Sequence, residues 1–113
     1  MKRIEKPWGF ELWWAVTDRY VGKLIHVNQG QSLSLQYHWV KHESMYVVAG
    51  EADVLIDGEV KRMRPGEAVE IAPMTRHRLT AVTDVDVMEV STPELDDVVR
   101  LEDIYGRQGT SAP

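Results

Sequence analysis

Apolar and polar residues alternate in short stretches along this chain, and turn-forming residues separate the stretches. Alternation with a period of two is typical of β-strands that have one buried face. No long window before residue 92 shows the 3.6-residue periodicity of an amphipathic helix. The pattern predicts strands at residues 10–16, 20–27, 32–38, 45–49, 51–56, 68–71, 77–82 and 85–91.

Turn signals lie between these predicted strands. Asp57-Gly58 follows Ile56 and precedes Val60, and an Asp-Gly pair between apolar runs is a strong signal for a tight β-hairpin. Glycines in residues 28–30, 49–50 and 64–66 supply further turns. Many short strands with such spacing are typical of a sandwich or barrel, so we predict an all-β protein.

The C-terminal segment has a different pattern. Val98, Leu101, Ile104 and Tyr105 are spaced as on one face of a helix, which predicts one or two helical turns. An irregular surface segment attached to the barrel by these apolar residues explains the pattern equally well. We expect residues 1–107 to form a single domain and residues 108–113 to be a disordered tail.

Composition narrows the classes of function. The 113 residues carry a net charge of −5, which argues against a nucleic-acid partner. The chain has no apolar run long enough to cross a membrane and no signal peptide at its start, so we expect no membrane partner. It has no cysteine, which excludes disulfides and thiolate ligands and is consistent with a cytoplasmic location.

Potential metal ligands lie on the polar face of the predicted strand at residues 32–38. Gln36 and His38 share this face and are about 7 Å apart along the strand. Glu43 and His77 would reach them from neighbouring strands. Two imidazoles, a carboxylate and an amide oxygen suit one divalent transition metal ion: zinc, manganese, cobalt, nickel or iron. The alternative is an edge strand whose polar face is in water.

Other side chains near these residues are candidates for chemistry. Glu89 alternates with Val87 and could point inward as a general base, or lie on the surface. Arg78 follows His77 directly, so alternation places it on the opposite face unless this part of the chain is a loop. Met74 is expected to fill the core, as are Met45, Met63 and Met88.

Two spaced motifs carry a resemblance to a known superfamily. Gly30, Gln36, His38, Glu43 and Gly50 match the spacing of the first cupin motif, with glutamine at the place of its first histidine. Gly66 and His77 resemble the second motif. Residues 6–11, 33–38, 71–79 and 100–107 are similar to the cupin domain of type II mannose-6-phosphate isomerases, and this resemblance covers residues 3–107.

The resemblance implies a cupin-type double-stranded β-helix, which is a jelly-roll barrel of two antiparallel sheets, with the metal inside. It also implies a homodimer, and it places Gln36, His38, Glu43 and His77 at the ligand positions. In that family the domain commonly follows a GDP-mannose pyrophosphorylase domain. Nothing precedes it here, so we expect no nucleotidyl transfer.

The chain departs from the family pattern next to two of the ligands. Residues 39–45 lack the usual histidines and the arginine-alanine-glutamate-histidine-tryptophan run that follow His38. Before His77, the usual proline-alanine-glycine is replaced by Ala72, Pro73 and Met74. We therefore expect the metal ligands to be kept and the wall of the pocket to be changed.

From the resemblance we expect an enzyme, a metal-dependent isomerase of carbohydrate metabolism that interconverts mannose 6-phosphate and fructose 6-phosphate. Glu89 or Lys41 would move the proton, and Arg78, Arg100 or Arg107 would bind the phosphate of the sugar phosphate. Two alternatives remain open: a non-catalytic cupin that binds a sugar or another small polar ligand, and a metal-dependent cupin of the dioxygenase type.

Overall fold

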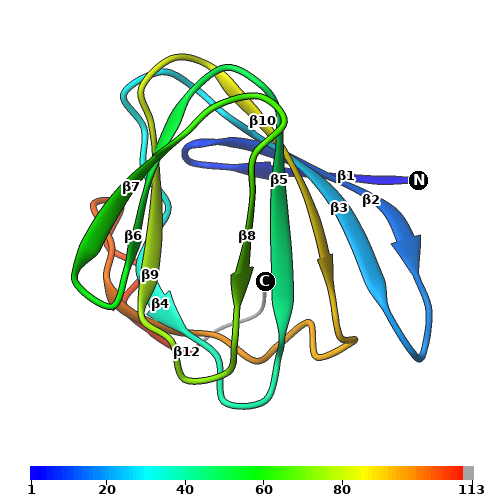
Figure 1. Cartoon of the computed structure of the whole chain (residues 1–113). Helices are drawn as coiled ribbons and strands as arrows, with labels where there is room; N and C mark the ends of the chain where they lie inside the picture. Colours follow the sequence, from blue (N-terminus) through cyan, green and yellow to red (C-terminus); the bar gives the residue numbers. More distant parts are fainter. Residues whose placement is uncertain (111–113) are drawn as a thin grey trace.

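Two six-stranded antiparallel sheets form the protein in the computed structural model, which describes residues 1–110 (Figure 1). The first sheet contains, in spatial order, β1 (Lys2–Lys6), β2 (Gly9–Val16), β3 (Val21–Val27), β10 (Val85–Ser91), β5 (Glu43–Ala49) and β8 (Ala68–Ile71). The second contains β12 (Gly109–Thr110), β11 (Val99–Glu102), β4 (Leu35–Tyr37), β9 (His77–Ala81), β6 (Ala52–Ile56) and β7 (Glu59–Met63).

Strands far apart in sequence are neighbours in both sheets. β3 pairs with β10, and β4 lies between β9 and β11, so that the chain crosses repeatedly from one sheet to the other. This arrangement is the jelly-roll barrel of the cupins, and it confirms the predicted fold class. The predicted strand at residues 32–38 is shorter than expected, because only Leu35–Tyr37 forms regular pairs.

The C-terminal segment agrees in part with the second expectation for it, because residues 92–98 form no regular element, Val98 is buried and Tyr105 packs against the core. No helix occurs within residues 1–110, so the predicted helical turns are wrong. Val99–Glu102 pairs with β4 instead, because the free edge of that strand offers backbone hydrogen bonds to the returning chain. Gly109–Thr110 pairs with β11, where the sequence predicted a disordered tail. Residues 111–113 of that tail lie outside the described part of the chain.

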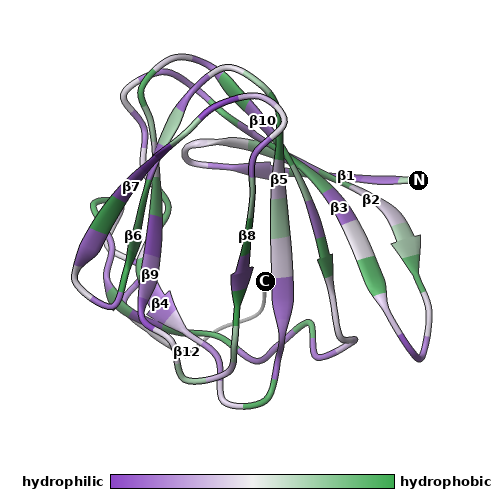
Figure 2. Cartoon of the chain, viewed as in Figure 1, coloured by the Kyte–Doolittle hydropathy of each residue, from purple (hydrophilic) through white to green (hydrophobic). Residues whose placement is uncertain are grey.

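The apolar core lies between the sheets. Alternate residues of β3, β5 and β10 point inward, as the two-residue period requires, and Val27, Val47 and Val87 are almost completely buried. This apolar core fills one part of the barrel. Figure 2 shows hydrophilic colour at the start of β5, where Glu43 lies, so the interior changes from apolar to charged along the strand.

The outer face of the first sheet exposes apolar side chains. Tyr46, Met88, Leu24 and Leu12 lie opposite one another on β5, β10, β3 and β2, and Tyr46 is 48% exposed. The homodimer stays a prediction, and this face is the surface on which a second copy would be sought. In residues 1–110 we find no helix suited to crossing a membrane. The cytoplasmic location also stays a prediction.

Two turns contain non-glycine residues with positive φ. Asp57 and Gly58 have φ values of 47° and 85°, as the predicted hairpin between β6 and β7 requires. Met74 has a φ of 67° and is 51% exposed, so the expectation that it fills the core is wrong. Its backbone N–H donates to the carbonyl of His38 at 2.7 Å, which explains the conformation of the turn.

We expect Met74→Gly to stabilise the protein. A left-handed conformation costs an L-residue about 1–2 kcal/mol, and the added freedom of an unfolded glycine offsets about 0.5–1 kcal/mol of the gain. The free energy of unfolding should therefore rise by about 0.5–1 kcal/mol in urea denaturation. Val60→Gly, at an exposed strand position, is the control and should lower stability. A loss of stability in Met74→Gly would contradict the prediction.

Candidate metal centre

The polar face of β4 points into the barrel. Ser34 and His38 are buried at its two ends, and with Gln36 between them they line a cavity of about 60 Å³. A cavity of this size accommodates a few water molecules or one small polar group. The alternative of an edge strand with its polar face in water is therefore wrong, because the second sheet folds this face against the first.

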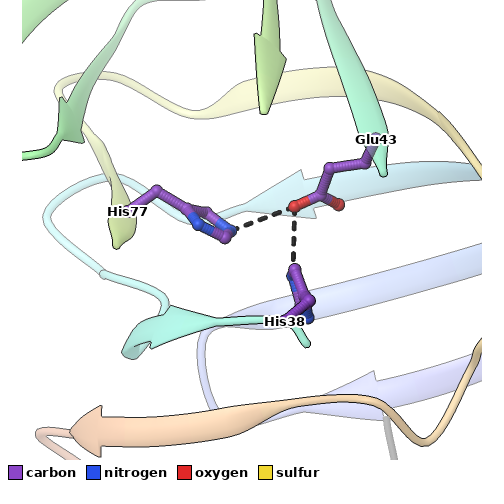
Figure 3. Close-up of side chains that lie close together, drawn as sticks. All are labelled: His38, Glu43 and His77. Carbon is purple, nitrogen blue, oxygen red and sulfur yellow. Dashed lines mark hydrogen bonds and ion pairs between the residues drawn. The ribbon is translucent and has the colours of Figure 1, made fainter. Parts of the chain in front are cut away.

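Three side chains from different parts of the barrel converge at one point (Figure 3). His38 follows β4, Glu43 begins β5 and His77 begins β9, and all three are at least 96% buried. The Oε1 atom of Glu43 lies 3.2 Å from Nε2 of His38 and 3.0 Å from Nε2 of His77. One donor atom from each residue lies within 4.8 Å of the others, so this triad could hold a metal ion.

The hydrogen bonds of the two histidines turn lone pairs toward the centre. Nδ1 of His38 donates to the carbonyl of Asp97 at 2.5 Å, and Nδ1 of His77 donates to the carbonyl of Thr75 at 2.9 Å. A carbonyl only accepts, so each neutral ring carries its proton on Nδ1 and leaves Nε2 as a lone-pair donor. His77 Nε2 is buried and has no hydrogen-bond partner among the described residues.

A bound cation would stabilise these three donor atoms. Two imidazole lone pairs and one carboxylate oxygen repel one another at these distances unless a positive charge lies among them. A divalent transition metal ion bound by two histidines and a carboxylate supplies that charge, and this donor set leaves further coordination positions open for a ligand. The residues present therefore fit the ion that the sequence predicted.

Gln36 lies beside the triad on the cavity wall. Its backbone position is directly opposite His77 on β9 and opposite Arg100 on β11. Its amide oxygen accepts a hydrogen bond from the Ser34 hydroxyl at 3.3 Å, which weakens its competition for a metal ion. The role of Gln36 as a fourth ligand stays a prediction.

Glu89 and Lys41 both line the cavity next to Glu43. The ammonium of Lys41 lies 3.5 Å from Glu43 and 3.7 Å from Glu89. Burial opposes the charge on Lys41, but the two carboxylates outweigh it and raise the pKa of Lys41. Burial and the nearby charge of Glu43 raise the pKa of Glu89 to about 8. The inward orientation of Glu89 agrees with one of the two alternatives from the sequence.

Glu43 itself remains ionised. Burial opposes its charge, but the hydrogen bond from Glu89, the close contacts with His38 and His77 and the charge of Lys41 hold the pKa of Glu43 well below its usual value. An ionised carboxylate in a buried site is the form that binds a metal ion.

The three predicted phosphate-binding arginines lie in two different places. Arg100 and Arg107 line the cavity, and Arg107 forms an ion pair with Asp103 at 2.9 Å. Arg78 is not among the cavity-lining residues; its guanidinium donates to the backbone carbonyls of Leu33 and Glu102. The alternation of β9 explains this position, because neighbours of an inward histidine point outward.

Sequence reasoning missed two buried charges of the pocket. Lys23 and Glu11 line the cavity from β3 and β2, at 3% and 7% exposure, and lie 3.4 Å apart. Lys23 stands among apolar alternate residues of its strand, and a lysine at an inward position was a signal that could have found it. The Glu11 position depends on the pairing of β2 with β3, which the sequence does not show.

Further basic residues surround this end of the pocket. Burial lowers the pKa of Lys6, and Arg100, Lys23 and Arg107 lower it further against the opposing charge of Glu11. Burial and the charge of Arg107 lower the pKa of Arg100. These cations repel one another, so an anionic group between them would be stabilised.

Comparison with known proteins assigns the family. The family described as "Mannose-6-phosphate isomerase C-terminal" matches residues 1–103. The chain belongs to this family. The match confirms the resemblance that the motifs carried, including the segments outside the cupin motifs.

Named relatives of the family are much longer proteins. The chain is 39% identical over 111 residues to mannose-1-phosphate guanylyltransferase of Escherichia coli strain K12, covering 94% of this chain and 23% of that protein. It is 33% identical over 112 residues to the alginate biosynthesis protein AlgA of Pseudomonas putida, covering 95% and 23%. The chain thus spans about a quarter of the length of these curated relatives, whose names belong to carbohydrate metabolism.

These relatives correct the predicted activity. The sequence predicted a mannose-6-phosphate isomerase, but the relatives are named as a guanylyltransferase and as an alginate biosynthesis protein. The isomerase prediction is therefore wrong. The isomerase activity was inferred from the resemblance of one domain. The same domain also occurs in proteins that carry other names. The first of these relatives is an enzyme by its name.

Solved structures of low sequence identity share the fold. KdgF from Halomonas sp. aligns with a TM-score of 0.74 and 22% identity, covering 82% of this chain and 86% of that one. A salicylate 1,2-dioxygenase from Pseudoaminobacter salicylatoxidans aligns with a TM-score of 0.68 and 16% identity, covering 72% and 26%. At these identities the likeness shows the fold alone.

Proposed function

We propose that this chain is a metal-dependent cupin domain that binds the phosphate group of a small anionic ligand, a sugar phosphate, beside a divalent ion. His38, Glu43 and His77 bind the ion, and Gln36 lies next to it as a weaker fourth donor. The observation that carries the proposal is the meeting of three acceptor atoms in a buried site, with His77 Nε2 left without a hydrogen-bond partner.

The ligand class follows from the charges of the pocket. Arg100 and Arg107 line the cavity that also contains the triad, and guanidinium groups suit phosphate through paired hydrogen bonds. Lys23, which is buried, adds a third cation to this wall. A divalent ion would polarise a carbonyl or phosphoryl oxygen of the ligand.

Two residues of the pocket stay candidates for proton transfer. Glu89 is buried beside Lys41, and its Oε2 has no hydrogen-bond partner among residues 1–110. A carboxyl group with one free oxygen on the cavity wall can exchange a proton with a bound ligand.

The test measures metal and phosphate binding in turn. Stripped protein is titrated with Mn²⁺ by calorimetry, and one ion per chain is expected. Inorganic phosphate is then added to the Mn²⁺-loaded protein, and relaxation of its ³¹P signal reports phosphate near the ion. Arg100→Gln and Arg107→Gln should each weaken phosphate binding about 10- to 100-fold, because a charge-assisted hydrogen bond contributes about 1.5–3 kcal/mol.

Arg78→Gln is the matched control. It removes the same charge from a guanidinium that is bonded to backbone carbonyls outside the cavity lining, so phosphate binding should not change. A melting curve of each variant establishes that the fold is intact. Equal losses in all three variants would reject the ligand site, and a protein that takes up no ion would reject the metal centre.

A further inference from the structure

The Asp97 side chain forms hydrogen bonds with the loop between His38 and Glu43, two of the proposed metal ligands. Its carboxylate accepts hydrogen bonds from the backbone N–H groups of Trp39, Val40 and Lys41, at 2.9, 2.7 and 2.9 Å. This loop begins directly after His38 and ends shortly before Glu43. Burial opposes the charge of Asp97, but these donors hold its pKa below the usual value.

The backbone of the same residue contacts His38. The Asp97 carbonyl accepts the hydrogen bond from His38 Nδ1, which sets the ring orientation and leaves Nε2 directed at Glu43. One residue therefore binds both the imidazole and the three peptide groups that follow it. The opposite side of His38 is bonded through its own carbonyl to the N–H of Met74.

The rest of the Asp97 segment is attached less directly. Thr92 Oγ1 accepts from the His42 N–H, and the Thr92 N–H donates to the His42 carbonyl, so this pair connects the far end of the loop. His42 is exposed and points to Glu70, away from the triad. Within residues 92–98 of the described chain, Asp97 is the residue that forms a hydrogen bond with a side chain of the metal centre.

We infer that Asp97 is a positioning residue for the metal centre: its carboxylate holds the 39–41 loop so that its carbonyl keeps His38 in the metal-binding orientation. This inference rests on the proposed metal site. If one carboxylate oxygen becomes an amide nitrogen, at least one of these backbone N–H groups loses its acceptor, and the loop and the His38 ring are free to move together. Outer hydrogen-bond partners of ligand histidines typically contribute 10- to 100-fold to metal affinity.

The experiment compares Co²⁺ binding in wild type, Asp97→Asn and Asp96→Asn. Asp96→Asn is the matched control, because it removes the same charge from an exposed neighbour in the same segment. Affinity is measured by competition with a chromophoric chelator, and the visible spectrum of bound Co²⁺ reports ligand geometry. The melting temperature of the metal-free proteins separates loss of stability from loss of positioning.

Asp97→Asn is expected to weaken Co²⁺ binding at least about tenfold and to alter the spectrum, while Asp96→Asn matches wild type. An Asp97→Asn protein with a lower melting temperature but wild-type affinity and spectrum would overturn the inference and leave a purely structural role. A wild-type protein that binds no Co²⁺ would reject the proposed metal site itself, which is a distinguishable result.

Discussion

His38→Ala is expected to lower the affinity of the protein for Zn²⁺ at least about 100-fold, more than the loss of an outer partner. The substitution removes one of three converging donors and leaves the buried Glu43 carboxylate with one imidazole. It also removes the group that the Asp97 carbonyl orients. Competition with a chelator of known affinity gives the dissociation constant.

His42→Ala is the control for this substitution. His42 lies four positions away, is exposed and pairs with Glu70 at 2.6 Å outside the triad. We expect its affinity to remain within about twofold of wild type, because it contributes no donor atom to the centre. The ligand assignment would be wrong if both alanine variants bound Zn²⁺ equally well.

Gly50→Ala should be the most destabilising of the substitutions considered for the scaffold. Gly50 has a φ of 80°, and a Cβ at this position would lie 1.9 Å from the backbone carbonyl oxygen of Asp84. The left-handed conformation costs about 1–2 kcal/mol and the backbone clash about 1–3 kcal/mol more, so we expect a loss of roughly 3 kcal/mol in the free energy of unfolding. Urea denaturation measures the difference.

Gly30→Ala separates the two contributions. Gly30 has nearly the same φ, 79°, but no atom lies within 4 Å of the position where a Cβ would stand. Only the conformational cost applies, so we expect a loss of about 1 kcal/mol. If the two variants lose equal stability, the close approach of Asp84 does not constrain the fold. A Gly50→Ala protein that cannot be purified folded agrees with the expected order.

The central strands of this chain could be predicted from alternation because each of them has one face on the core. Alternation at residues 85–91 predicted β10 with correct bounds, since a one-residue slip would turn the buried Val85 and Val87 out of the core. Short edge strands lack this constraint. β11 alternates apolar and charged residues over only four positions, too few to predict a strand, and its pairing with β4 decides its conformation.

The three residues of the triad were predicted because they occur at the motif spacing in the sequence. The residues around the triad reach it through contacts between distant parts of the chain. Asp97 and His38 are 59 residues apart, so their hydrogen bond has no local signal. The sequence left open whether Glu89 pointed inward, and the pairing of β10 between β3 and β5 determined that it does. The activity was mistaken because resemblance of a domain does not establish the reaction of a whole protein.

By itself, the sequence determined the all-β class, the central strands, the hairpin at Asp57-Gly58 and the three side chains that the structure brings together in the triad. These features depend on period-two alternation, on a local turn conformation or on fixed motif spacing, all of which are properties of neighbouring residues. Only the tertiary structure decided which charges from distant strands share the cavity: it brought Glu11, Arg100 and Arg107 to it. That choice is made by sheet pairing between distant strands, because pairing sets which face of each strand the barrel encloses.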